Sequence, residues 1–245
     1  MIRTAVAADS VGMFMFEGFS TNDLVALVIF VAAWGGYERY GARALETGSN
    51  TSLWMNRWRR HWMQAAIARD NRIGDLQIIR VLTGNSAFLA STAIFVTAGI
   101  AAVIGSADRV IEILNGYEFL AETTRNQFGL KLAVIAFIFV NAFFPLAWSM
   151  RLHSNAAVVL GAIPQPEKIE DQARAEAQAE LAADLCNLAA KHYQGGMHAY
   201  YFGFAACAWF AHPVGLVVAG LWVVGILYRR EFRSRALAGL GQIPD

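Results

Sequence analysis

Long apolar stretches separated by shorter polar segments dominate the pattern of this chain. Three of them are nearly uninterrupted and a fourth contains His212-Pro213; they cover residues 24–36, 87–105, 130–148 and 200–228. In lipid, a helix satisfies all of its own backbone hydrogen bonds, so such stretches predict transmembrane helices. The pattern therefore predicts an all-α integral membrane helical bundle, a single domain over residues 1–245 with about four transmembrane helices.

The last stretch, residues 200–228, leaves two interpretations open. As one helix it would be about 43 Å long at about 1.5 Å per residue, which exceeds a hydrocarbon core of about 30 Å. Pro213 lies near its middle and has no backbone N–H to donate. The stretch is therefore either one long tilted helix or two segments broken at His212-Pro213, and we favour the break.

Residues 46–72 predict an amphipathic helix on the membrane surface. Tryptophans recur at every fourth position and arginines flank them; these residues are Trp54, Trp58, Trp62, Arg57 and Arg60. A spacing of four keeps the tryptophans on one side of a helix, and arginines beside them suit anionic head groups. The alternative is that the tryptophans pack against a second, soluble helix.

Residues 166–194 predict a cytoplasmic polar helix. A thin apolar stripe from Ile169 to Leu188 lies among charged and small residues, so the segment is too polar to span a membrane. Gly195-Gly196 is expected to end this helix, because glycine is common just after a helix terminus.

The distribution of arginines orients the bundle. Eight arginines lie between the first and second apolar stretches, whereas the connection between the second and third has an excess of acidic residues. Arginine-rich loops stay in the cytoplasm, so the N-terminus is expected outside a bacterial inner membrane. If both parts of the last stretch enter the membrane and return, the arginines after Tyr228 also lie inside.

Short motifs in the middle of the chain resemble a known family. They are RHWM at residues 60–63, DN at 70–71, LQIIR at 76–80, Asn85 and FLASTAI at 88–94, followed later by WF at 209–210, Pro213 and ILY at 226–228. Over roughly residues 23–230 the chain is similar to DUF599, a family of uncharacterised membrane proteins found in bacteria and plants. The resemblance implies a multi-span membrane protein and brings no catalytic residues.

A set of polar residues within the apolar stretches forms the candidate functional site. Its members are Arg80, Asn85, Ser91, Thr92, Thr97 and Asn141. They could line a hydrated path through the membrane, or they could be interhelical hydrogen bonds of about 0.6 kcal/mol each. Because one side of the second stretch is small and polar, we expect this helix to be central in the bundle.

Signals for other functions are weak or missing. We find no catalytic triad, phosphate loop or dinucleotide motif, and the histidines and cysteines have no zinc or haem spacing. We therefore expect no cofactor and no metal, and nothing favours an enzyme. A net charge of +1 gives no reason to expect a nucleic-acid partner.

Two functional hypotheses remain. The first is a self-associating bundle that lines or supports a pathway for an ion or small solute, with Arg80 at its inner mouth. The second is a non-catalytic accessory or scaffold subunit, which would dock on a larger membrane complex through the polar helix or the tryptophan face. The expected partners are membrane lipids, together with further copies of the chain or that larger complex.

Overall fold

A computed structural model describes residues 20–47, 50–116, 124–234 and 239–240, and over these residues the chain is helical and has no strand. Seven α-helices and two short 3₁₀ turns follow one another: α2 (Thr21–Thr47), α3 (Thr51–Ile67), α4 (Ile73–Gly105), α5 (Ala107–Asn115), α6 (Arg125–Ala162), η1 (Pro166–Lys168), α7 (Gln172–Ala206), η2 (Cys207–Phe210) and α8 (Pro213–Phe232). The predicted all-α class is confirmed.

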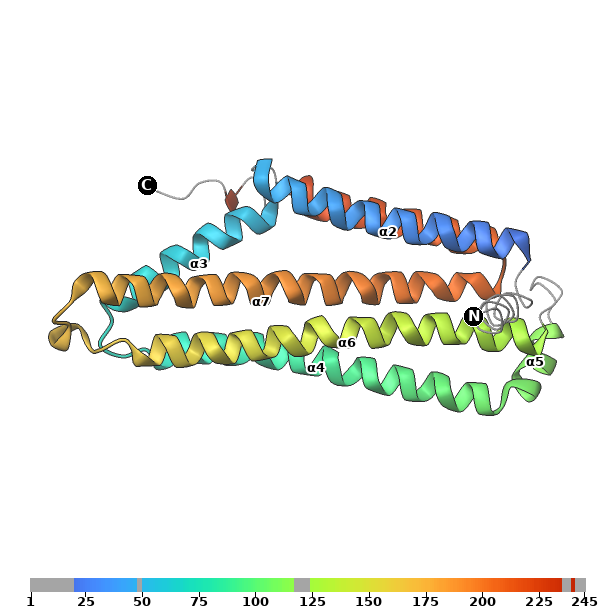
Figure 1. The fold of residues 1–245 in the computed structure, drawn as a ribbon, viewed down its shortest axis with the longest axis horizontal. Helices are drawn as coiled ribbons and strands as arrows, with labels where there is room; N and C mark the ends of the chain where they lie inside the picture. The colour runs from blue at the N-terminus through green and yellow to red at the C-terminus, as the bar shows by residue number, and fades with distance from the viewer. Residues whose placement is uncertain (1–19, 48–49, 117–123, 235–238, 241–245) are drawn as a thin grey trace, which may run out of the picture.

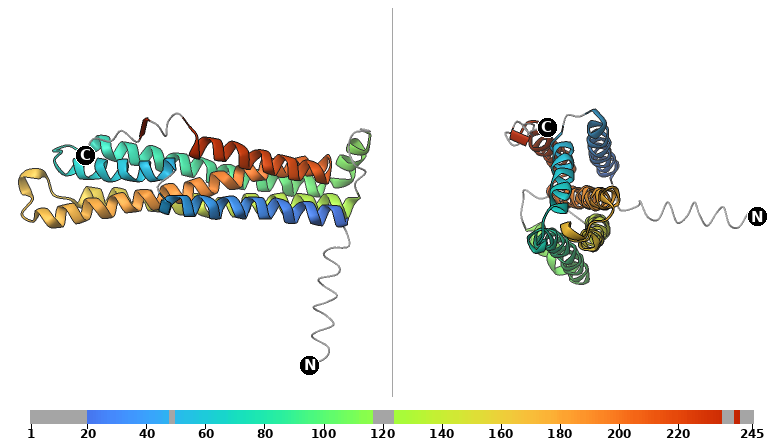
Figure 2. Two further views of the ribbon diagram at one scale, coloured as in Figure 1. Left: turned by 90° about the horizontal axis from the view of Figure 1, so that it is seen from above. Right: turned by 90° about the vertical axis from the view of Figure 1, so that its left-hand side faces the viewer.

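The helices form an elongated bundle around an antiparallel pair, α6 and α7 (Figure 1). α4 packs along α6, and α3 packs on the first half of α7. α2 and α8 lie side by side against the second half of α7, and the short α5 closes that end of the bundle (Figure 2). One half of the bundle therefore contains α2, α8 and parts of α4, α6 and α7, while the other half contains α3 and the remaining parts.

Side-chain caps define where several helices begin. Thr124 and Gln127 form a reciprocal capping box at the start of α6. Asp171 Oδ1 accepts a hydrogen bond from the Arg174 backbone N–H at 3.0 Å, which starts α7. These caps satisfy backbone N–H groups that have no partner within the helix.

The predicted break at His212-Pro213 is confirmed. α7 ends at Ala206, η2 follows, and α8 begins at Pro213 and returns antiparallel to α7. His212 caps α8, because its Nδ1 accepts from the Val214 N–H at 3.1 Å. Proline is favoured at the first helical position, where its missing N–H costs nothing. The stretch is thus two helical segments.

The predicted helix end at Gly195-Gly196 is wrong. α7 begins at Gln172 and continues through both glycines to Ala206, so the polar segment and the apolar segment form one helix. Gly196 is needed for packing: a Cβ atom there would lie 2.5 Å from Cγ of Leu146 on α6. The glycine therefore permits a close helix–helix approach.

α4 lies at the edge of the bundle, so the expected central position is wrong. It begins at Ile73, before the apolar stretch of residues 87–105, and packs mainly on α6. Ser86 Oγ lies 3.1 Å from Ser149 Oγ in this buried contact. On the opposite side, Phe88 and Phe95 are 70% and 74% exposed, which suits a lipid-facing surface.

Three helices among the described residues, α4, α6 and α8, are long and apolar enough to cross a membrane. The expected number of four spans is not confirmed by length and composition, because α2 and α7 carry more polar residues. Together, α4, α6 and α8 give the chain the character of a helical membrane protein.

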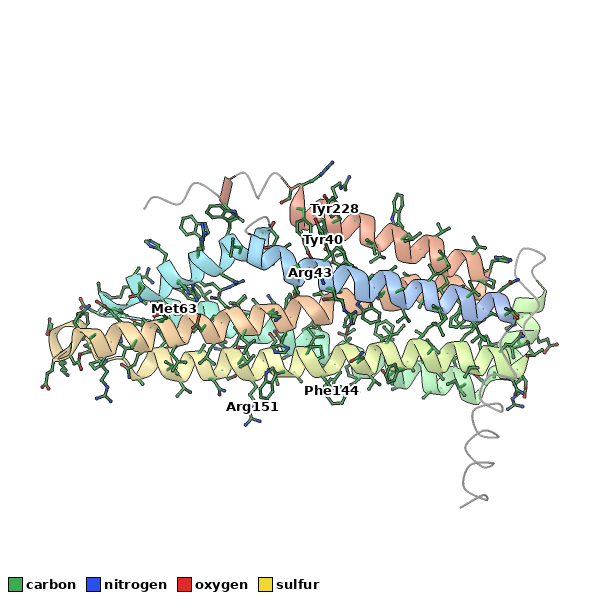
Figure 3. The ribbon with its side chains drawn as sticks, turned by 45° about the horizontal axis from the view of Figure 1, so that its top comes forward. Tyr40, Arg43, Met63, Phe144, Arg151 and Tyr228 are labelled. Atoms are coloured by element: carbon green, nitrogen blue, oxygen red, sulfur yellow. The ribbon has the colours of Figure 1, made fainter. Side chains whose placement is uncertain are left out.

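Small residues allow α3, α6 and α7 to pack closely in the other half of the bundle. Ala179, Ala182 and Ala183 of α7 are fully buried there, together with Met63 of α3. Figure 3 shows Met63 beside α7, whereas Phe144 points outward from α6. The apolar side of the polar helix is thus largely covered within the chain.

Candidate functional site

His198 of α7 lies between two carboxylates from two other helices. Its Nδ1 is 2.8 Å from Glu38 Oε1 on α2, and its Nε2 is 2.9 Å from Glu231 Oε1 on α8. The imidazole is buried, with its side chain 6% exposed. Two carboxylate acceptors match the two N–H donors of an imidazolium ion, so this geometry favours the charged form.

Two neutral side chains, Tyr37 and Gln194, join these three ionisable ones. We call the whole set the His198 cluster: Tyr37, Glu38, Gln194, His198 and Glu231. The Tyr37 hydroxyl donates to Glu231 Oε2 at 2.6 Å, and Gln194 Nε2 donates to Glu231 Oε1 at 2.7 Å. These bonds tie α2, α7 and α8 together at one level of the bundle.

The start of α3 adjoins this cluster. Thr51 Oγ1 donates to the backbone oxygen of Glu231 at 2.9 Å, and Ser52 Oγ donates to Gln194 Oε1 at 3.0 Å. α8 therefore ends beside the arginine-rich helix α3. A cavity of about 70 Å³ lies here, and Glu38, His198 and Glu231 are among its lining residues.

A second ionic cluster lies near the start of α2. Asp23 Oδ1 accepts from Trp209 Nε1 at 2.7 Å and lies 3.6 Å from Lys131 Nζ on α6. Lys131 also donates to the Trp209 backbone oxygen at 3.3 Å, and its ammonium lies 5.6 Å from the Trp209 ring centroid. Both charged side chains are buried, so each one offsets the cost of burying the other.

An apolar groove of about 580 Å³ runs along α2 between these two levels. Its walls come from α2, α6 and α7: Leu27, Phe30, Val31, Trp34, Gly35, Glu38, Val134, Phe137, Ile138, Asn141, Pro145, Gly195 and Ala199. Among these described residues Glu38 is the ionisable one. Because Glu38 also lines the 70 Å³ cavity, it joins the groove to the His198 cluster.

The polar side chains that line the groove are the carboxylate of Glu38, the amide of Asn141 and the indole of Trp34. Glu38 contributes a carboxylate, and its side chain is 42% exposed. Pro145 has no N–H, so the carbonyl of Asn141, four residues earlier, loses its helical donor. Glu38 is thus the charged side chain that lines this groove, and its carboxylate also contacts His198.

The predicted pathway residues are not gathered into one site. Thr92 and Thr97 donate to backbone oxygens of their own helix, at 2.9 and 2.8 Å. Arg80, Asn85 and Ser91 are exposed on α4. Asn141 alone of the six lines the groove, on α6. Both roles suggested for the α4 residues, lining a hydrated path and forming interhelical hydrogen bonds, stay predictions.

The predicted amphipathic helix exists as α3, and two of its tryptophans, Trp54 and Trp58, point away from α7. Met63 is buried beside α7, and Trp54 and Trp58 lie about 180° and about 140° from it around the helix. Arg57 lies over the Trp54 ring at 4.7 Å. Trp54 and Trp58 thus face away from the polar helix, whereas Trp62 packs against the buried cluster formed by α3, α6 and α7. The position of the tryptophans at the membrane interface stays a prediction.

The remaining two members of the predicted interface set make contacts within the chain. Trp62 Nε1 donates to Asp75 Oδ1 at 2.7 Å. Arg60 forms an exposed ion pair with Asp184 of α7 at 3.0 Å. These two bonds fix α3 against the start of α4 and the first half of α7.

Sequence reasoning missed the residues of both ionic clusters. The available signal was an ionisable residue at the edge of an apolar stretch, as at Asp23, Glu38 and Lys131, since such residues in membrane proteins usually have partners. His198 belongs to the histidines without a zinc or haem spacing, and the structure shows both of its ring nitrogens paired with carboxylates. Its partners lie 160 and 33 residues away, which no local spacing reveals.

The apolar helices, together with the buried ionic clusters at Asp23 and at Glu38 of α2, are typical of a helical membrane protein with internal charged sites. Over residues 25–236 the chain matches the model of the family described as "Protein of unknown function, DUF599", so it belongs to that family and the resemblance is confirmed. Comparisons with curated proteins and with solved structures give no match.

Proposed function

We propose that this protein crosses the bacterial inner membrane five times, through α2, α4, α6, the second half of α7 and α8. Figure 1 supports this arrangement, because these segments lie alongside one another in the same half of the bundle. From Asp23 to Glu38, α2 rises about 22 Å at about 1.5 Å per residue. α2 would then cross most of the hydrocarbon core, with an ionic cluster at each end.

The charges at the two ends of the bundle support an orientation with the N-terminus outside. α3 and the end of α8, which contact each other, carry arginines; these are Arg57, Arg59, Arg60, Arg229 and Arg230. α5, at the opposite end, carries Asp108 and Glu112 and a single arginine, Arg109. The arginine-rich end would be cytoplasmic, and the even number of crossings from α3 to α8 would return the chain to that side.

We further propose that the groove along α2 is a membrane pathway for a small organic cation. The observation that carries this proposal is the position of Glu38, a carboxylate at the end of an otherwise apolar groove and in contact with His198. An apolar wall suits the organic part of such a solute, and Glu38 and Asn141 suit its charge. The pathway would thus follow α2 rather than α4.

The accessory-subunit hypothesis has lost part of its basis. It rested on an apolar stripe of the polar helix, and much of that side of α7 is buried within the chain against α3 and α6. Leu181 and Leu188 remain exposed, by 51% and 42%. Self-association and a larger complex stay predictions, because a single chain does not test them.

Uptake by proteoliposomes tests the pathway. Wild-type protein should accumulate radiolabelled tetraethylammonium, and Glu38→Gln should reduce the rate at least about tenfold, because a lost charged contact costs about 1.5–3 kcal/mol. The amide oxygen can still accept from His198, so folding should persist. Glu112→Gln, an exposed substitution on α5, is the matched control. Equal uptake by wild type, Glu38→Gln and empty liposomes would refute the pathway.

A further inference from the structure

A polar cleft of about 460 Å³ lies between α3 and the middle of α7, outside the groove along α2. Its lining residues are Thr51, Ser52, Met55, Asn56, Arg59, Asp184, Asn187, Leu188, Ala190, Lys191, Tyr193 and Gln194. Neither the family description nor the proposed pathway gives this cleft a role.

Arg59 is a partly buried cation that has no carboxylate partner among the described residues. Its NH1 donates to the amide oxygens of Asn56 and Asn187, at 3.0 and 3.3 Å, which are both neutral groups. Burial lowers the pKa of the Arg59 guanidinium below its ordinary value. A charge withdrawn from water normally has an ionic partner, because burying it alone is costly.

The thiol of Cys186 near Arg59 does not supply that partner. Cys186 is fully buried on α7, and burial raises the pKa of its thiol to about 11. The group therefore remains a neutral thiol near neutral pH. The carboxylate that lines the cleft, Asp184, already forms its ion pair with Arg60.

Other groups in the cleft also suit a negative charge. Lys191 adds a second cation and has no ion pair within the described part of the chain. Because Asn56 and Asn187 use their oxygens to accept from Arg59, their amide nitrogens remain as donors. Thr51 and Ser52 form the first turn of α3, where backbone N–H groups and the helix dipole favour anions.

We infer that the cleft between α3 and α7 binds a phosphate-bearing anion. Arg59 would hold the phosphate with its planar guanidinium, while Lys191 and the amides of Asn56 and Asn187 complete the contacts. The volume exceeds that of a bare ion and suits an organic phosphate, either a soluble compound or the head group of an anionic lipid. Gln194 lines the cleft and bonds to Glu231, so the occupant would lie next to the His198 cluster.

Thermal unfolding of the full-length protein in a neutral detergent tests the site with inorganic phosphate and with glycerol 3-phosphate. Wild type should unfold at a temperature that rises with the concentration of either probe, because a ligand that binds the folded state stabilises it. Arg59→Gln should weaken the apparent affinity at least about tenfold. Arg57→Gln is the matched control: Arg57 is exposed on α3 and lies outside the cleft, so its loss should leave the phosphate response unchanged.

The behaviour without phosphate separates binding from a structural role. If Arg59 serves the ligand, Arg59→Gln should unfold at the same or a higher temperature than wild type when no phosphate is present. If Arg59 only joins α3 to α7, the variant should unfold at a lower temperature and respond to phosphate as wild type does. That second outcome, or a wild type indifferent to both probes and to lipid, would overturn the inference.

A lipid arm identifies the source of the phosphate. If the occupant is a lipid head group, wild type should unfold at a higher temperature than Arg59→Gln in nanodiscs of phosphatidylglycerol. In nanodiscs of phosphatidylcholine, the unfolding temperatures of the two proteins should not differ in this way. Stabilisation by glycerol 3-phosphate in phosphatidylcholine nanodiscs, without a phosphatidylglycerol effect, would indicate a soluble occupant. The result is independent of tetraethylammonium uptake, so either proposal can fail without the other.

Discussion

The His198 cluster shows how few residues connect three helices of this protein. One imidazole contacts a carboxylate from α2 and another from α8, and the second carboxylate also receives Tyr37 and Gln194. Removing the central donor would leave two carboxylates close together with no cation between them. Such a loss is expected to cost more than an ordinary hydrogen bond, because an unpaired buried charge remains.

His198→Gln is therefore expected to destabilise the protein by about 3 kcal/mol. For a chain of this size that corresponds to a fall of about 6–12 °C in unfolding temperature. His192→Gln is the control, since His192 lies on the same helix and its side chain has no hydrogen bond among the described residues. Equal unfolding temperatures for the two variants would contradict the role we give to the cluster.

At the level of the helices, the two adjacent glycines of α7 have opposite roles. A Cβ atom at Gly195 would meet nothing within 4 Å, whereas one at Gly196 would overlap Leu146 of α6. Gly195→Ala should be neutral or stabilise by up to about 1 kcal/mol, because alanine favours a helix. Gly196→Ala should destabilise by about 1–3 kcal/mol, as overpacking does.

Unfolding of these variants in detergent measures the difference. Adding Leu146→Ala to Gly196→Ala should restore part of the lost stability relative to the sum of the two single substitutions, because the overlap is removed. Strict additivity of the two substitutions, or an equal effect of alanine at both glycines, would show that α6 and α7 do not approach each other as described.

The same glycines show what sequence reasoning could establish. The apolar stretches, the amphipathic segment and the break at Pro213 each have a local signal, namely hydropathy, periodicity or a missing N–H, and the structure confirms these elements. Gly195-Gly196 carries a local signal for a helix end, but the packing of Gly196 on Leu146 prevails. The edge position of α4 and the pairing of His198 with Glu38 and Glu231 depend on distant residues, so no local pattern predicted them.

At the level of the whole molecule, the proposed pathway depends on the direction of each crossing. The groove along α2 lies within the membrane only if α2 and the second half of α7 both cross it. α8 then returns its arginines to the side of α3, as the Thr51–Glu231 contact requires. If the second half of α7 did not cross, four crossings would remain. α8 would then begin on the cytoplasmic side and end outside, the reverse of the proposed arrangement.

Labelling of single cysteines in intact cells, with a maleimide that does not cross membranes, tests this most directly. Cys186 and Cys207 are first replaced by serine, and one cysteine is introduced at an exposed site, by Glu112→Cys, Glu176→Cys or Arg229→Cys. The five-crossing arrangement predicts labelling of the Glu112→Cys variant in intact cells, and of the other two only after the membrane is permeabilised. Labelling of the Arg229→Cys variant in intact cells would contradict the arrangement and remove the basis for a pathway along α2.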